Sequence, residues 1–128
     1  MAAKKIIQEW LLAAEKDLKI AKEDIDKPSR RQDVSFHCQQ AGEKFLKAFI
    51  IFKNLKFRPT HDLETLLDIC SQQNKEFEFI RSQCKMLSPF YIGTRYPEFD
   101  EELTKEEIKE VLGYAEKVAE FVKKKIKP

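Results

Sequence analysis

Residues 36–49 have the sequence FHCQQAGEKFLKAF, and this stretch decides the fold class. Its apolar side chains recur at steps of three and four residues, the spacing of one side of an α-helix. They are Cys38, Ala41, Phe45, Ala48 and Phe49, and Phe52 continues the spacing beyond the stretch. A second row at helical spacing is polar and consists of His37, Gln40, Lys44 and Lys47. An imidazole, an amide and two ammonium groups on one side suit an anion, the edge of a nucleotide, or a partner helix.

The same periodicity predicts a helix on the N-terminal side of this stretch. Regularly spaced apolar residues mark a first helix over residues 3–26, which must end before Pro28 because proline cannot continue it. Ser29 is the expected N-cap of the second helix, over residues 30–54. We expect these two helices to form an antiparallel hairpin.

Shorter elements are predicted after residue 55. Arg58-Pro59 indicates a turn, Thr60 is the expected cap of a third helix, and Asp62 is expected in its first turn. A break is expected near Gln73-Asn74. A fourth helix ending at Pro89 is then marked by Phe77, Ile80, Cys84 and Leu87.

Residues 89–103 form the longest irregular stretch, and Thr104 begins the last helix with a capping box completed by Glu107. There is no strand pattern. The sequence therefore predicts an all-α fold, an up-and-down helical bundle of about five helices, as a single domain over residues 1–128.

Composition limits the classes of function. A net charge of +2 is too small to argue for nucleic-acid binding by itself. No apolar run has the length of a membrane span, and the first ten residues, MAAKKIIQEW, lack the apolar segment of a signal peptide, so we expect a cytoplasmic protein without membrane association. Cys38, Cys70 and Cys84 are odd in number and lack CxxC spacing, so we expect reduced, buried thiols. We expect no metal site and no cofactor.

Four groups of residues together suggest a family. They are Trp10, Ala14 and Asp17-Leu18; Phe36-His37-Cys38-Gln39-Gln40-Ala41 with Glu43-Lys44; Thr60-His61-Asp62-Leu63; and Tyr91 with Thr94-Arg95-Tyr96-Pro97. In this order and spacing the chain resembles the HEPN domain family (higher eukaryotes and prokaryotes nucleotide-binding), and within it the small stand-alone prokaryotic members. The resemblance covers about residues 5–125.

The resemblance implies a helical bundle that forms a homodimer and is often encoded beside a minimal nucleotidyltransferase, in some cases as a toxin–antitoxin-like pair. Family members that cleave RNA use an Arg-x4-6-His motif on a late helix, completed across the dimer. Here Arg95 is followed by Asp100, Glu101 and Glu102, and no histidine comes later. We therefore assign no confident catalytic residue; if the chain is an RNase, His37 and Arg95 are the residues expected to act.

The expected ligand-binding residues are His37, Gln40, Lys44, Arg95 and Tyr96. Lysine and arginine suit phosphate, and tyrosine can stack on a base. Secondary candidates are Asp17, Glu43, His61, Asp62 and Tyr91.

Each of these residues also has a structural interpretation. Arg95 can pair internally with Asp17 or Glu43, and His37 can be satisfied by a hydrogen bond within the bundle. Asp62 can cap a helix while His61 packs over the turn. His61 follows His37 by 24 residues, and a straight helix of that length separates its ends by about 36 Å, so the two histidines are not expected to share a site.

Together these patterns favour a non-catalytic nucleotide-binding and partner module that dimerises and acts with a minimal nucleotidyltransferase. The alternative is a metal-independent RNase with a composite site across the dimer, in which an imidazole and an arginine act on a phosphate of RNA. A third interpretation is a structural assembly subunit that buries the polar row in an interface.

Overall fold

The computed structural model describes residues 2–57, 59–91 and 103–126. In this part of the chain the ordered elements are helices, and no strand is present. The α-helices are α1 (Ala2–Asp24), α2 (Arg31–Phe52), α3 (Leu63–Gln73), α4 (Arg81–Leu87) and α5 (Lys105–Lys125), and the 3-10 helices are η1 (Pro28–Arg30), η2 (Lys75–Ile80) and η3 (Ser88–Phe90).

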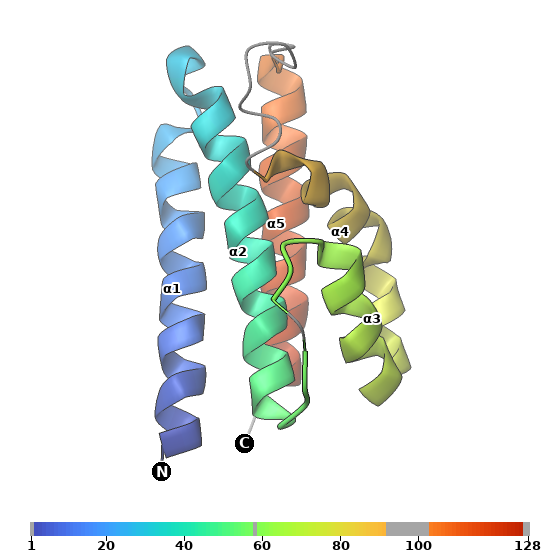
Figure 1. Cartoon of the computed structure of the whole chain (residues 1–128). Helices are drawn as coiled ribbons and strands as arrows, with labels where there is room; N and C mark the ends of the chain where they lie inside the picture. The colour runs from blue at the N-terminus through green and yellow to red at the C-terminus, as the bar shows by residue number, and fades with distance from the viewer. Residues whose placement is uncertain (1, 58, 92–102, 127–128) are drawn as a thin grey trace.

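The three long helices lie side by side, with α2 between α1 and α5 (Figure 1). α1 and α2 form the predicted antiparallel hairpin, and α5 runs in the same direction as α2. The short helices α3 and α4 pack against α2 and α5 on the side away from α1. The predicted all-α helical bundle is confirmed.

One feature of the path was not expected: residues 53–57 and 59–62, which we call the return segment, run back along α2 (Figure 1). Asn54 has a φ of 54°, a left-handed conformation that asparagine tolerates better than most residues. Its backbone N–H donates to the carbonyl of Ile51, which closes the turn after α2. Because the chain doubles back, α3 begins beside the middle of α2 and not beyond its end.

The apolar stripe of α2 is the centre of the core, as predicted. Cys38, Ala41, Phe45, Ala48 and Phe49 are at most 1% exposed, and Phe52 packs at the margin. All three cysteines are free and buried, which confirms their assignment as structural thiols. Burial raises the pKa of the Cys38 and Cys84 thiols to about 12 and raises that of Cys70 as well, so none is a nucleophilic thiolate at neutral pH.

Two predicted helix caps are wrong. Ser29 lies inside η1, and the N-cap of α2 is Arg30, whose side chain makes no capping bond. The N-cap of α3 is Asp62, which accepts from the backbone N–H of Glu64, while Thr60 accepts from the N–H of Asp62 one turn earlier. Proline at the start of η1 and the Asx geometry of Asp62 decide these ends.

The predicted fourth helix is three elements, η2, α4 and η3, and α4 ends at Leu87, with Pro89 inside η3. Asn74 caps both the end of α3 and the start of η2, so the predicted break is confirmed. The chain then forms the 3-10 helix η2 and continues as α4 from Arg81. The three-residue step from Phe77 to Ile80 fits either helix type, so apolar spacing alone could not distinguish them. The capping box of Thr104 and Glu107 on α5 is confirmed.

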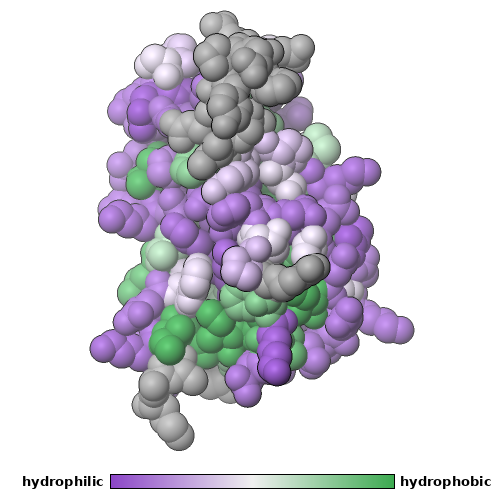
Figure 2. Space-filling model, viewed as in Figure 1, coloured by the Kyte–Doolittle hydropathy of each residue, from purple (hydrophilic) through white to green (hydrophobic). Residues whose placement is uncertain are grey.

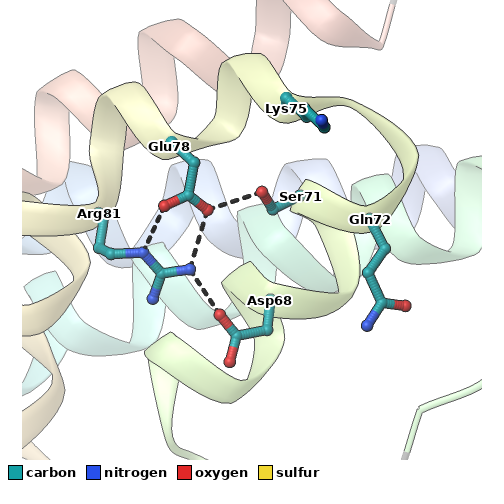
Figure 3. Close-up of a pocket in the computed structure, with 6 residues that line it drawn as sticks. All are labelled: Asp68, Ser71, Gln72, Lys75, Glu78 and Arg81. Atoms are coloured by element: carbon teal, nitrogen blue, oxygen red, sulfur yellow. Dashed lines mark hydrogen bonds and ion pairs between the residues drawn. The ribbon is translucent and has the colours of Figure 1, made fainter.

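A charged cluster joins α3 to η2 and α4 (Figure 3). Arg81 donates from Nε to Glu78 Oε1 at 2.7 Å and from Nη2 to Glu78 Oε2 at 2.9 Å. The same guanidinium reaches Asp68 and Glu64, and Ser71 donates to Glu78 at 2.6 Å. Asp68, Ser71, Glu78 and Arg81 line a shallow hollow together with Gln72 and Lys75. The cluster fixes where η2 turns back against α3.

This cluster predicts an acid-dependent loss of stability. The hydrogen bonds from Arg81 and then Ser71 lower the pKa of Glu78 from 4.5 to about 2. A folded-state pKa below the unfolded value stabilises the fold above about pH 4.5, and this stabilisation disappears as the pH falls toward 2. Glu78→Gln should therefore flatten the decline in unfolding free energy over that range, measured by urea denaturation at several pH values. The exposed Glu110→Gln variant should keep the wild-type slope; equal slopes for Glu78→Gln and wild type would contradict the assignment.

Two helical glycines make a matched pair for stability. A Cβ added at Gly113 meets no atom within 4 Å, whereas one at Gly42 would lie 3.3 Å from Leu63 Cδ1 and 3.4 Å from Leu87 Cδ1. Gly113→Ala should raise the free energy of unfolding by about 0.5–1 kcal/mol, because alanine costs less backbone entropy in a helix. Gly42→Ala should gain less, since Leu63 has to shift. Urea denaturation of both variants measures the difference, and a larger gain at Gly42 would contradict the packing described for it.

None of the helices in the described ranges is both long enough and apolar enough to cross a membrane.

Candidate functional site

The first half of the site joins α1 to α2 through Asp17. The Asp17 side chain is only 10% exposed, and its Oδ1 lies 2.8 Å from Nδ1 of His37. Its Oδ2 accepts a hydrogen bond from Nζ of Lys44 at 2.6 Å. Ala14 and Ala21, one turn to either side of Asp17, are fully buried and small, which lets α2 approach closely. One buried carboxylate thus holds an imidazole and an ammonium group.

The second half repeats this arrangement around Glu43. Its side chain is 5% exposed, Oε1 lies 2.9 Å from Nδ1 of His61, and Oε2 accepts from Nζ of Lys47 at 2.8 Å. Lys47 is itself only 11% exposed, and its ammonium lies 5.7 Å from the centroid of the Trp10 ring. The site therefore contains two sets, each made of a carboxylate, an imidazole and an ammonium group, along one side of α2.

Gln39 fastens the return segment to α2. It is fully buried, and its Nε2 donates to the carbonyl oxygen of His61 at 2.9 Å. Its Oε1 accepts from Gln40 at 2.8 Å, and both amides lie 3.5 Å from Glu43 Oε1. Since buried amides are stable only when hydrogen-bonded, this set fixes the backbone position of His61.

The expectation that His37 and His61 are about 36 Å apart in space, too far to share a site, is wrong. The estimate assumed a continuing helix, but the return segment brings His61 back beside Gln39 and Glu43, within two turns of His37. His61 was also interpreted as a residue that packs over the turn. In the structure its Nδ1 instead bonds to the buried carboxylate of Glu43.

The two histidines and two other aromatic side chains, Phe36 and Tyr91, form a row of four rings. His37 meets Phe36 edge to face at 5.6 Å between centroids, and Phe36 lies 6.3 Å from Tyr91. Tyr91 stacks on His61 at 3.7 Å with an interplanar angle of 13°. The His61 side chain remains 49% exposed and that of His37 23%. We call the two carboxylate sets and these four rings the histidine surface.

The carboxylates decide the tautomer of both histidines. Asp17 and Glu43 each also accept from an ammonium group, so both are ionised and can only accept hydrogen bonds. Each Nδ1 must therefore bear the proton it donates, and each Nε2 points away from its carboxylate. A neutral imidazole in this state offers an acceptor at Nε2, and it can also take up a proton there.

The structure brings most of the predicted residues together. Six of them belong to the histidine surface: Asp17, His37, Glu43, Lys44, His61 and Tyr91. Gln40 lies beside it, with its Nε2 3.5 Å from Glu43 Oε1. Asp62 instead caps α3, and hydrogen bonds from Thr65 and Ser88 lower the pKa of its carboxyl. Arg95 and Tyr96 lie outside the described residues.

Sequence reasoning missed Gln39, Trp10 as a neighbour of Lys47, and the contact of Phe36 with Tyr91. Gln39 did give a signal: it shares a helical face with Glu43 and Leu46, so a polar residue there is positioned for burial. The bonds of Gln40 that the structure shows stay within α2.

The histidine surface occupies part of a larger face. Figure 2 shows hydrophilic residues across the middle of this face and hydrophobic residues toward the end where α1 begins and α2 ends. Partly buried apolar side chains from this end include Phe52, Leu55 and Phe57. Within the described ranges, no group of three or more His, Cys, Asp or Glu side chains is arranged to hold a metal ion.

Similarity to solved structures agrees with this architecture. TT1696 from Thermus thermophilus is 26% identical, with a TM-score of 0.78 over 94% of this chain and 98% of that one. ST0689, described as an archaeal HEPN homologue, is 23% identical, with a TM-score of 0.74 and the same coverage. Among proteins with curated functions, none matches the sequence. The family model for the HEPN domain matches residues 7–125, nearly the whole chain, and the chain therefore belongs to the HEPN domain family.

Proposed function

We propose that this protein is a non-catalytic nucleotide-binding and partner module whose ligand binds at the histidine surface. The observation that supports this most is the pair of carboxylate-held imidazoles, His37 and His61, joined by the Phe36 and Tyr91 rings. The set combines flat rings with fixed hydrogen-bonding groups, the combination with which proteins bind single nucleotides and bases. Gln39 and the two buried carboxylates hold these groups in place before any ligand arrives.

The partners in this proposal are a second copy of the chain and a minimal nucleotidyltransferase, in a toxin–antitoxin-like pair. The apolar area at the end where α1 begins and α2 ends supports a protein partner, because an exposed apolar area with a polar neighbour is typical of interaction surfaces. A partner bound there would cover the edge of the histidine surface as well, so nucleotide and partner binding should influence each other.

The test is calorimetric titration of the four ribonucleoside 5′-monophosphates into the wild-type protein. At least one should bind with a dissociation constant in the upper-micromolar range or tighter. The double variant His37→Ala/His61→Ala should lose at least about tenfold in affinity, near 1.4 kcal/mol. Lys19→Ala, at a 77% exposed position on α1, should bind as the wild type does. Equal binding by the double variant and wild type would move the site elsewhere, and no binding of any monophosphate would end the proposal.

A second candidate function, a metal-independent RNase, is favoured by one observation. Each histidine has a carboxylate at Nδ1, the arrangement that in acid–base enzymes orients an imidazole for proton transfer at Nε2. One neutral imidazole would take the proton of a ribose 2′-OH at its Nε2, and the other, carrying a second proton on Nε2, would give that proton to the departing 5′-oxygen.

Single-stranded RNA incubated in EDTA separates the two functions. The module proposal expects no cleavage by a folded protein of known mass in solution. Cleavage by the wild type that is lost in both His37→Ala and Arg95→Ala would establish the RNase instead. Cleavage that persists in both variants would identify a contaminating nuclease.

A further inference from the structure

The described cations of the histidine surface are already paired. Lys44 donates to Asp17 at 2.6 Å, and Lys47 donates to Glu43 at 2.8 Å and is nearly buried. Each set contains one carboxylate and one ammonium group, so with neutral imidazoles its net charge is zero. A phosphate that recruited either lysine would leave a buried carboxylate without its cation, which costs free energy. The surface is therefore a poor site for an anion.

The imidazoles lead to the same conclusion. Because Nδ1 of His37 and of His61 donates to a carboxylate, the neutral rings offer lone pairs at Nε2. Phosphate oxygens are also acceptors, so they gain no hydrogen bond from such a nitrogen. Ribose hydroxyls and the exocyclic amino groups of bases are donors, and they match it.

The stacked rings of His61 and Tyr91 provide a contact for the base of the ligand. Tyr91 lies against one face of His61, yet the His61 side chain is still half exposed. A planar base can therefore stack on this pair while a ribose hydroxyl donates to an Nε2. Stacking of a base on an aromatic side chain stabilises the complex and needs no charge.

We infer that the histidine surface recognises the nucleoside, through its base and ribose hydroxyls, and not the phosphates of a nucleotide. This inference rests on the proposed function and states which part of the ligand is bound. It distinguishes this surface from phosphate sites built on helix N-termini or on unpaired lysine and arginine side chains.

The experiment compares three ligands with one base: the nucleoside whose 5′-monophosphate binds best, that monophosphate, and the triphosphate. Calorimetry at pH 8, on the basic side of histidine's usual titration range, is run at low and at moderate sodium chloride. We expect the three dissociation constants to agree within about threefold and to change little with salt, since few ion pairs form. A triphosphate that binds more than about tenfold tighter than the nucleoside, with strong salt dependence, would overturn the inference while leaving the proposed function intact. If none of the three ligands binds, the proposed function fails, and the inference fails with it.

A substitution at His61 tests the acceptor itself. His61→Phe keeps an aromatic ring against Tyr91 but removes Nε2, so nucleoside affinity should fall by about tenfold. Lys19→Ala serves again as the unaffected variant, and the thermal midpoint of each variant shows that it is folded. Wild-type affinity in folded His61→Phe would show that stacking alone binds the ligand and would overturn the role given to Nε2.

Discussion

Glu43→Gln should lower the free energy of unfolding by about 3 kcal/mol, because the neutral amide leaves Lys47 as a nearly buried ammonium group without a counter-ion. His61 also loses the acceptor that holds its Nδ1. For a domain of this size the thermal midpoint should fall by roughly 10 °C. Urea denaturation and calorimetry measure both quantities.

Two controls isolate the effect of burial. Glu120→Gln breaks a glutamate–lysine pair of the same i, i+4 spacing, with Lys124, but both side chains are more than two-thirds exposed, so its loss should stay below about 1 kcal/mol. The double variant Glu43→Gln/Lys47→Met removes both charges and should recover part of the loss. Equal costs for Glu43→Gln and Glu120→Gln would contradict the description of Glu43 as a buried anchor.

Phe77→Ala should be the most damaging single truncation considered for this chain, with a loss of about 3–5 kcal/mol. Phe77 is fully buried in the 3-10 helix η2, and its ring lies 4.4 Å from that of Phe49 on α2 and 5.0 Å from that of Phe121 on α5. Its removal leaves a cavity where three elements meet. The free energy of unfolding from urea denaturation gives the result.

Phe79→Ala is the matched control, two residues further along η2. Its side chain is 74% exposed, so its truncation should change stability by less than about 0.5 kcal/mol. Comparable losses at both positions would mean that the rings of η2 are not divided between core and solvent as described.

Much of the fold could be predicted because helical periodicity is a local signal. The spacing of Cys38, Phe45 and Phe49 identified the buried side of α2, and the capping box of Thr104 identified the start of α5. Ser29 was misjudged because its prediction used only the preference of serine for N-caps, whereas Pro28 begins a short 3-10 turn that includes it.

The candidate site could be predicted only in part, because its geometry depends on tertiary contacts. The row of His37, Gln40 and Lys44 was visible on α2, but the carboxylate partner of His37 and Lys44 lies on α1. The position of His61 depends on a reversal at Asn54 and on the bond from Gln39, which no local pattern encodes. The sequence predicted helix through residue 54 and a turn at Arg58-Pro59, and the direction of the chain after α2 is set by packing.

Imidazole NMR locates the bound nucleotide, which we propose lies at His37 and His61. The chain has only these two histidines, so its two sets of imidazole signals both report on the histidine surface. The ring nitrogen signals should first show a proton on Nδ1 of both residues at pH 8. During titration with the best-binding 5′-monophosphate, both imidazole signals should then shift and saturate together. Imidazole signals that stay unchanged while the ligand binds elsewhere, or that show the proton on Nε2, would contradict the account.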